Sequence, residues 1–346
     1  MDAPVARALR SLADGRRLGE SLTQEAFGQV MLGEATPAQV GALLLGLRVQ
    51  VETADEITGA VKALRAAMVR VEVADRSRLV DTCGTGGGAI TTFNISTAAA
   101  LVAVGAGAVV AKHGNRSYTS QCGSADVLQA LGIPIATDSA GVTRLLERAG
   151  MAFLFAPAFH PAMRHVAPVR RELAIATIMN VIGPLANPAG VSRQLLGVAD
   201  PERAPVIAEA LRRLGAEHAL VVHGTIGMDE IAPTGSTAMW EVHGGQLRNY
   251  VIDPSSYDLR HDDIAALAGG EPAENAARVT RLLLDPGSDP AGRAAVALNA
   301  GAAVYVAGLG GSLQEGIEQA LTALEEGRGA SALERLKRES GVSTSE

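Results

Sequence analysis

The sequence predicts an α/β protein, with a small all-helical N-terminal domain and a larger α/β domain built on a mostly parallel central sheet flanked by helices. From residue 79 onward, short apolar segments of strand length alternate with helical patterns, which is typical of βαβ units. Before residue 79, apolar residues recur only at helical spacing. Aromatic residues make up 3% of the chain, and Ala, Val, Leu and Gly are abundant. This composition favours closely packed helices and parallel strands over a β-sandwich.

The N-terminal region carries three capping motifs, in which Ser or Thr stands three residues before Gln or Glu and an apolar helical pattern follows. The motifs begin at Ser21, Thr36 and Thr53. Pro37 follows Thr36, in a position that proline favours in the first turn of a helix. Together these signals predict about four helices.

A second helical region interrupts the strand pattern. Between about residues 160 and 190 the strand signal vanishes: HPAMRHVAPVRREL has a helical pattern, and NVIGPLANPAG is rich in turn residues. We expect this segment to cross back to the helical domain. The predicted domains are therefore residues 1–73, completed by residues 160–190, and residues 74–346.

The second domain is expected to contain short strands that end in loops. Strands are predicted at 79–81, 109–111, 153–155, 194–198 and 219–222. After residue 258 the pattern is mainly helical, at 262–267, 274–284, 291–307 and 313–327. In α/β folds ligands bind at the carboxyl ends of the strands, so the loops that follow them are the first place to look for a site.

Charge and composition exclude several classes of protein. The net charge is −7, the pI is about 5.6, and no basic run of five residues occurs, so a nucleic-acid surface is not expected. The N-terminus lacks the apolar region of a signal peptide, and the longest apolar stretches are broken by Gly or Asn. We expect a cytoplasmic protein, in which Cys83 and Cys122 are small reduced residues rather than redox or metal-binding groups.

The first candidate site is the glycine-rich loop Gly84–Gly88, which has glycine at four of its five positions. A polar run from Thr91 to Thr97 follows, and then an Ala-rich helix. Glycines let backbone N–H groups approach a ligand, and a helix N-terminus attracts anions. The loop matches neither GxGxxG nor GxxxxGK[ST]. A plain tight turn with a helix cap is the alternative, but the pattern favours a phosphate cradle.

The second candidate is the loop from Lys112 to Ser120, which follows the next predicted strand. It brings together a cation, the imidazole of His113, the amide of Asn115 and several hydroxyls. Alone, His113 is as consistent with a structural role as with a functional one. Beside the glycine-rich loop, this segment predicts the second half of an anion cradle at adjacent strand ends.

Two further patterns suit a carboxylate substrate and a metal. Arg170 and Arg171 point in different helical directions, so both cannot face one cleft; a guanidinium in a pocket would bind a carboxylate, whereas Arg171 could simply pair with Glu172 or face solvent. Asp229 and Glu230 follow a predicted strand. On their own they indicate an acidic turn, but beside a diphosphate they predict a Mg²⁺ site.

Together these segments closely resemble the anthranilate phosphoribosyltransferases. The resemblance extends from the N-terminal helices to about residue 321. Its most specific pieces are GTGG, TFNIST, AKHGNR, GSADVLQALG, FHPAMRHVAPVRREL, GPLANPAG and GMDE, in family order and spacing.

The resemblance implies a homodimer that associates through the helical domain. It also implies transfer of the phosphoribosyl group of 5-phosphoribosyl 1-diphosphate (PRPP) to the amino group of anthranilate, with two Mg²⁺ ions per active site. This is the second step of tryptophan synthesis from chorismate, and its products are N-(5-phosphoribosyl)anthranilate and diphosphate. Anthranilate's amine is a weak base that reacts unprotonated, so no single catalytic acid or base is assigned.

The resemblance also implies site residues. The PRPP contacts are expected from Gly84, Gly87, Gly88, Thr92, Asn94, Ile95, Ser96, Thr97, Lys112, His113, Gly114, Asn115, Arg116, Ser117, Tyr118, Thr119, Ser120 and Ser124. The anthranilate contacts are expected from Gly84, Asn115, Arg170, His113 and His160. The metal ligands are expected to be Ser96, Asp229 and Glu230.

Several positions depart from the family pattern. The family usually has Asp at Gly88, Lys-Ser at Gln121-Cys122, Gly at Ala174, Arg at Ala176 and Phe at Met179. These changes leave open a divergent paralogue with another aromatic acceptor. A pyrimidine-nucleoside phosphorylase of the same fold is a further alternative, but its Lys-His-Ser loop is absent. A non-catalytic nucleic-acid-binding relative should carry a basic groove, which the net charge argues against.

Overall fold

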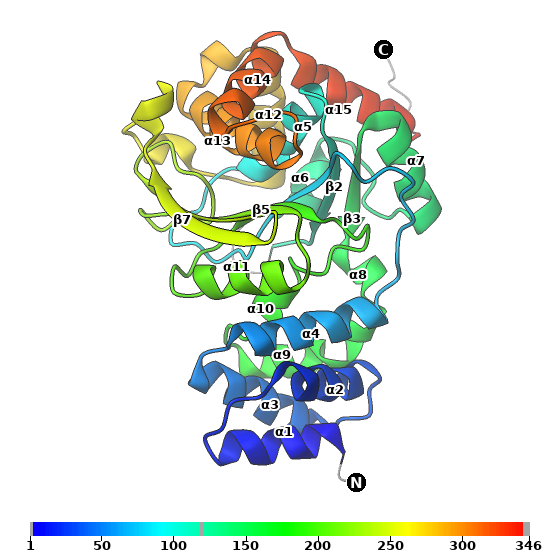
Figure 1. The fold of residues 1–346 in the computed structure, drawn as a ribbon. Coiled ribbons are helices and arrows are strands. Elements are labelled where there is room, and N and C mark those ends of the chain that lie inside the picture. The colour runs from blue at the N-terminus through cyan, green and yellow to red at the C-terminus, as the bar shows by residue number, and fades with distance from the viewer. Residues whose placement is uncertain (1–2, 118–120, 342–346) are drawn as a thin grey trace.

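The computed structural model describes residues 3–117 and 121–341. A bundle of helices forms one end of the molecule, and a sheet with helices on both faces forms the other (Figure 1). No described helix has the length and apolar character needed to cross a membrane.

Four helices make up the N-terminal bundle: α1 (Pro4–Ala13), α2 (Glu20–Met31), α3 (Pro37–Gln50) and α4 (Ala54–Ala67). The capping boxes at Thr36 and Thr53 both form. The box predicted at Ser21 does not, because α2 already begins at Glu20. Ser21 therefore lies inside the first turn, where its hydroxyl donates to the Glu25 carboxylate at 3.2 Å.

The segment that was expected to cross back does lie against this bundle. It follows α8 (Ala156–Phe159) and forms a 3₁₀ turn (Pro161–His165), α9 (Ala167–Leu173) and α10 (Met179–Ile182). Helix α9 packs on α3, and α10 packs on α4. One apolar cluster joins these helices to α11 (Ala204–Arg213) and to the sheet face beneath it. The division of the chain into domains at residue 73 remains a proposal.

The sheet has seven strands in the order β3-β2-β1-β4-β5-β6-β7. They are β1 (Leu79–Gly84), β2 (Val109–Gly114), β3 (Met151–Phe155), β4 (Arg193–Gly197), β5 (His218–Gly224), β6 (Thr237–His243) and β7 (Gln246–Ile252). The first five are parallel, and β6 and β7 add an antiparallel hairpin that was not predicted from the sequence.

The other helices pack mainly around a second apolar cluster. They are α5 (Ile95–Gly105), α6 (Ser124–Ala130), α7 (Ser139–Ala149), α12 (Pro272–Leu284), α13 (Pro290–Val306), α14 (Leu313–Glu325) and α15 (Arg328–Glu339), with short 3₁₀ turns at Pro254–Tyr257, Ala265–Leu267 and Pro286–Ser288. The helix predicted at 262–267 is thus only a 3₁₀ turn, and α15 was not predicted. Small residues allow close crossings: a Cβ on Gly301 of α13 would lie 2.5 Å from Ile317 Cα of α14.

Candidate functional site

The glycine-rich loop begins at the carboxyl end of β1 and encloses the loop that carries Asp229. Gly86 and Gly87 adopt positive φ angles of 67° and 81°, a conformation that glycine adopts at little cost. The Gly86 N–H donates to Asp229 Oδ2 at 3.0 Å. A Cβ on Gly84 would lie 2.8 Å from Asp229 Oδ2, and one on Gly197 only 1.6 Å from the Asp229 carbonyl oxygen. These glycines therefore form a notch into which the Asp229 segment fits.

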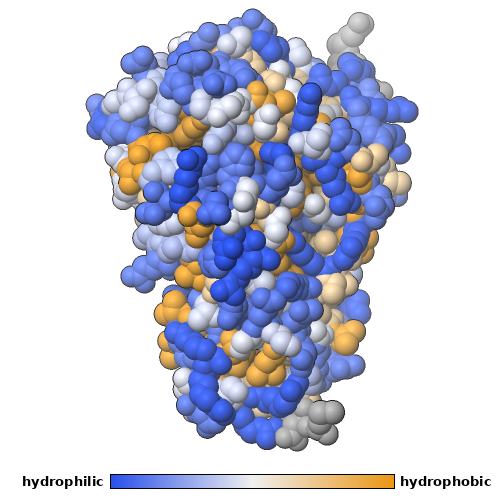
Figure 2. Space-filling view, in the orientation of Figure 1, coloured by the Kyte–Doolittle hydropathy of each residue, from blue (hydrophilic) through white to orange (hydrophobic). Residues whose placement is uncertain are grey.

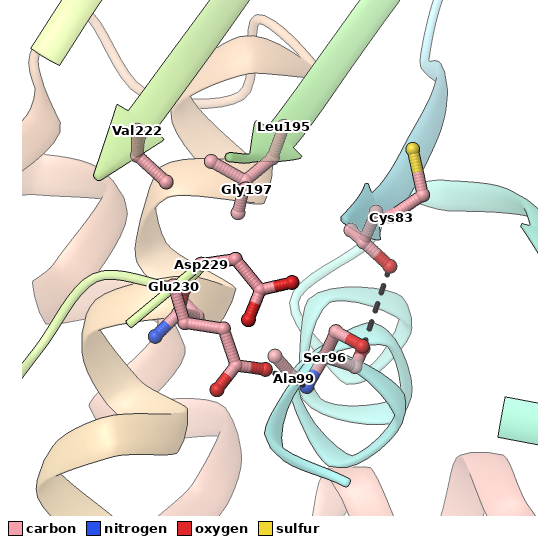
Figure 3. Close-up of a pocket in the computed structure, with 10 residues that line it drawn as sticks. Cys83, Ser96, Ala99, Leu195, Gly197, Val222, Asp229 and Glu230 are labelled. Atoms are coloured by element: carbon pink, nitrogen blue, oxygen red, sulfur yellow. Dashed lines mark hydrogen bonds between the residues drawn. The ribbon is translucent and has the colours of Figure 1, made fainter. Parts of the chain in front are cut away.

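Glu230 lies at the N-terminus of α5. Its carboxylate accepts hydrogen bonds from the Ser96 N–H and the Thr92 hydroxyl, both at 3.2 Å. Loss of hydration and the neighbouring Asp229 charge raise the pKa of Glu230 to about 8, and loss of hydration raises the pKa of Asp229 as well. Figure 3 shows both carboxylates in a pocket that Ser96, Cys83 and Gly197 also line. Two crowded carboxylates with raised pKa values form a site that a cation would stabilise.

Lys112 supplies a buried cation beside this pair. Its side chain is 1% exposed. The Nζ donates to the Thr82 carbonyl oxygen at 2.5 Å and to Ser96 Oγ at 3.2 Å. Burial lowers the pKa of Lys112, while the charges of Asp81 and Glu230 act in the opposite direction. The ammonium group therefore links the end of β1 to the first turn of α5.

The buried carboxylate of Asp81, on β1, links β1 to β2 and to the segment that carries Asn187. Its Oδ1 accepts the His113 backbone N–H at 3.1 Å, and its Oδ2 accepts from Asn187 Nδ2 at 2.9 Å. Asn187 also donates to the Ala111 carbonyl oxygen at 2.8 Å. Burial raises the pKa of Asp81 to about 6, although these hydrogen bonds lower it. The network fixes β2 relative to β1 and ties both to the segment 183–190.

His113 and His160 are brought together from distant parts of the chain. Their Nε2 atoms are 3.2 Å apart, and both rings are buried. Burial lowers the pKa of His113 to about 3 and that of His160 to about 4. Both imidazoles are therefore neutral at pH 7, one Nε2 donating and the other accepting.

Asn94 ties three segments together instead of capping α5 with its side chain. Its Nδ2 donates to the Cys122 carbonyl oxygen at 3.1 Å, and its Oδ1 accepts from Asn275 Nδ2 at 3.0 Å. The next residues differ from the expected polar lining, because the side chains of Ile95 and Thr97 are fully buried. Both residues are buried as a whole, backbone included, so neither presents surface to a ligand in this structure.

The first residues after β2, 115–117, are anchored on α6. The Arg116 guanidinium pairs with Asp126 and donates to Gln129, and the Ser117 N–H donates to Asp126 Oδ2 at 3.3 Å. Asn115 Oδ1 accepts the Arg116 N–H at 2.8 Å. Two other predicted residues lie close together, since a Cβ on Gly114 would be 3.4 Å from Ser124 Cβ. Tyr118, Thr119 and Ser120 lie outside the described residues.

Arg170 comes from the bundle rather than from the sheet. It is half-buried on α9, whereas Arg171 is exposed. The structure thus groups the glycine-rich loop, the start of α5, Lys112 and the Asp229–Glu230 pair, and it places Arg170 on a separate element.

Comparison with known proteins assigns the family. Models described as the α/β domain and the helical bundle domain of a glycosyl transferase family match residues 76–330 and 6–68. The chain is 49% identical over 331 residues to an anthranilate phosphoribosyltransferase of Rubrobacter xylanophilus, covering 96% of each chain. The chain belongs to the anthranilate phosphoribosyltransferase family.

Solved structures agree with this assignment. The anthranilate phosphoribosyltransferase of Thermus thermophilus superimposes with a TM-score of 0.91 at 42% identity, covering 96% of this chain and 99% of that one. The Saccharomyces cerevisiae enzyme, in complex with PRPP and Mg, superimposes with a TM-score of 0.87 at 28% identity, covering 99% of both chains.

The positions that depart from the family pattern lie in different environments. Gly88 faces the Asp229 segment, where a Cβ would be 3.1 Å from the Gly227 carbonyl oxygen. Ala174 ends α9 with a left-handed φ of 51°, which explains why glycine is favoured there. Ala176 and Gln121 are exposed, and Met179 is buried in the bundle.

Some residues of the site were missed because they act only through tertiary contacts. Gly197 makes room for Asp229, and Asn187, Asn275 and Asn299 bond to site segments from distant parts of the chain. The one sequence signal was a set of Asn residues within apolar or Ala-rich stretches.

One other cluster has the composition of a metal site. His218, Glu241 and His243 form the single such group of three in residues 3–117 and 121–341. However, both oxygens of Glu241 already accept hydrogen bonds: Oε1 from His218 and Tyr305, and Oε2 from Tyr250 and Arg248. Four donors satisfy the carboxylate and lower its pKa to about 2. The cluster is therefore a structural link between β5, the β6–β7 hairpin and α13.

Proposed function

We propose that the chain transfers the phosphoribosyl group of PRPP to the amino group of anthranilate, giving N-(5-phosphoribosyl)anthranilate and diphosphate. In this reaction the bond from C1 to the diphosphate oxygen breaks, a bond from C1 to nitrogen forms, and the amine loses a proton. The observation that supports it best is the cluster of glycine loop, helix N-terminus, buried Lys112 and carboxylate pair, in a chain 49% identical to a named enzyme of this activity.

We propose that PRPP binds at the carboxyl edge of the sheet. The diphosphate would lie against the loop Gly84–Gly88 and the N-terminus of α5, and it would compete with Glu230 for the Ser96 N–H. We propose the same PRPP contacts that the sequence predicts, including those from the loop that runs from Lys112 to Ser120. Lys112 would stabilise the charge that develops on the leaving diphosphate.

We propose that Ser96, Asp229 and Glu230 hold Mg²⁺, with two ions per active site. Oxygen ligands of this kind suit Mg²⁺, which is usually completed by water and substrate phosphates. The residues present fit the ion, because two neighbouring carboxylates with raised pKa values gain from a cation. The bound ion would neutralise the diphosphate as it leaves.

We propose that anthranilate binds between Gly84, Asn115 and Arg170, along a path lined by His113 and His160. The guanidinium suits the anthranilate carboxylate, and the two neutral imidazoles place no second cation beside it. The protein need then only align the amine with C1, and alignment alone can contribute roughly 7–11 kcal/mol to lowering the barrier.

We further propose a cytoplasmic homodimer that associates through the bundle. Large apolar side chains are exposed there, namely Leu32 at 70%, Leu45 at 45%, Val49 at 73% and Val51 at 48%. Figure 2 shows hydrophobic side chains gathered among hydrophilic ones at this end of the molecule. Burial of these side chains against a second copy would contribute to stability. Light scattering coupled to gel filtration tests the dimer, and replacing Leu45 and Val49 with Ser should yield monomers.

The activity is tested by the loss of anthranilate fluorescence in the presence of PRPP and Mg²⁺. We expect turnover that needs all three components, and its loss in the double variant Asp229→Asn, Glu230→Gln. Folded protein that consumes no anthranilate, but does consume another aromatic amine, would support the divergent acceptor instead. Consumption of neither would reject the proposed function.

A further inference from the structure

Asn299 is a buried amide in the middle of the apolar helix α13. The residue is 3% exposed, and most of its neighbours in the helix are Ala, Val or Gly. A buried amide is costly unless its donors and acceptor are satisfied. Here all are used: Oδ1 accepts the Ile231 N–H at 3.0 Å, and Nδ2 donates to the Ile231 and Ala295 carbonyl oxygens, both at 2.9 Å.

Two of these three bonds hold the backbone of a single residue, and that residue directly follows Glu230. Ile231 N belongs to the peptide group that Glu230 begins, so Asn299 fixes the chain immediately after the carboxylate pair. Ile231 is itself 1% exposed. Without Asn299, its N–H and carbonyl group would lose these partners, which is unfavourable for buried backbone groups.

The other side of the pair is held by the sheet. The Asp229 carbonyl oxygen lies against Gly197, and its Oδ2 accepts the Gly86 N–H. Asp229 and Glu230 are therefore braced between strand ends on one side and α13 on the other. Such bracing matters because the two carboxylates repel each other when both are ionised, so they can converge on one ion only if the backbone restrains them.

We propose that Asn299 is a positioning residue that holds the Asp229–Glu230 pair in the geometry that binds Mg²⁺. This inference rests on the proposed function, because it assigns the pair to the metal. Asn299 lines the same pocket as both carboxylates, but its three bonds go to the backbone, so its effect on the ion is exerted through Ile231.

Two variants separate the effect of the two bonds to Ile231 from the effect of the bond to Ala295 within α13. Asn299→Leu removes all three bonds while keeping a similar volume. Asn299→Ser keeps a hydroxyl that can bond to the Ala295 carbonyl oxygen, as serine does in helices, but it is too short to replace both bonds to Ile231. Leu298→Ala is the matched control, because it removes a buried side chain from the adjacent position of the same helix.

The measurements are calorimetric binding of PRPP as a function of Mg²⁺, steady-state kinetics and thermal unfolding. For both Asn299 variants we expect the half-saturating Mg²⁺ concentration to rise at least tenfold and the anthranilate KM to change less than twofold. Leu298→Ala should lower the melting temperature while leaving the Mg²⁺ titration unchanged. If Asn299→Leu does not fold, the smaller Asn299→Ser change still gives the comparison.

The outcomes are distinguishable from failure of the proposed function. An inactive but folded wild type rejects the proposed function. An active wild type whose Mg²⁺ titration is unchanged in the Asn299 variants overturns the role of Asn299 alone. A shift of equal size in Leu298→Ala would also overturn it, because the effect would then reflect stability rather than position.

Discussion

Replacing Gly197 with Ala should displace the Asp229 segment and strongly reduce metal-dependent turnover. A Cβ at this position would lie 1.6 Å from the Asp229 carbonyl oxygen and 2.5 Å from its carbonyl carbon. Both partners are backbone atoms, so no side chain can rotate away. The oxygen must move until the separation reaches roughly 3.0 Å or more, the closest approach that packed atoms tolerate. A shift of this size is comparable with the misplacement of about 1 Å that can reduce a rate about 100-fold.

The assay is the loss of anthranilate fluorescence at several Mg²⁺ concentrations, beside thermal unfolding. We expect kcat/KM to fall at least 100-fold, and overpacking to lower the free energy of unfolding by about 1–3 kcal/mol. Gly28→Ala is the matched control, because a Cβ there meets nothing within 4 Å and alanine favours a helix. Retention of wild-type activity and metal dependence by Gly197→Ala would refute the notch as the feature that sets the position of Asp229.

Four further predictions concern the same site and its surroundings. Arg170→Ala should raise the KM for anthranilate far more than the KM for PRPP, and equal effects on both would reject its proposed carboxylate partner. Gly88→Asp should place a third carboxylate beside Asp229, so unfolding without Mg²⁺ should occur at lower temperature, and a PRPP titration should depend more steeply on Mg²⁺ than in the wild type. Because the pKa of Glu230 is raised from 4.5 to about 8, this group holds a proton in the metal-free folded state that it releases on unfolding. The contribution of Glu230 to stability should therefore fall as the pH rises from about 4.5 to 8, so in urea unfolding the wild type should lose stability relative to Glu230→Gln over that range. Ala174→Gly should raise the free energy of unfolding by about 1 kcal/mol, since the exposed residue has a left-handed φ, and a lower midpoint in urea would contradict this.

Local signals explain which parts of the fold could be predicted. Thr36 and Thr53 open helices as expected because their partners lie three residues away, and the parallel strands follow apolar runs that are visible in the sequence. The hairpin of β6 and β7 was missed because β7 is an edge strand with mostly exposed side chains, so it lacks a buried apolar run. A local signal was nevertheless present: Gly244-Gly245 joins the strands, and both residues have positive φ.

The residues of the site likewise divide into those that sequence patterns could predict and those that only tertiary contacts reveal. The glycine-rich loop, Lys112 and Asp229–Glu230 were predictable as a group, because each lies near or beyond the carboxyl end of one of the parallel strands. The roles of Gly197 and Asn299 were not, because each depends on a contact with a segment more than 30 residues away. Nor could spacing reveal that Asn94 bonds to Asn275 rather than capping its own helix.

The location of Arg170 on α9, away from the sheet that carries the glycine-rich loop, has an evolutionary consequence. Helix α9 packs on α3, whereas the carboxylate pair is braced by β4 and α13. Substitutions at the exposed positions 174 and 176 can therefore accumulate without disturbing the contacts that hold Asp229 and Glu230, whereas Met179 lies in the apolar cluster that reaches the sheet. Under the proposed function, descendants of such a protein could acquire a new aromatic acceptor through changes at exposed positions of this segment while the PRPP site stays unchanged.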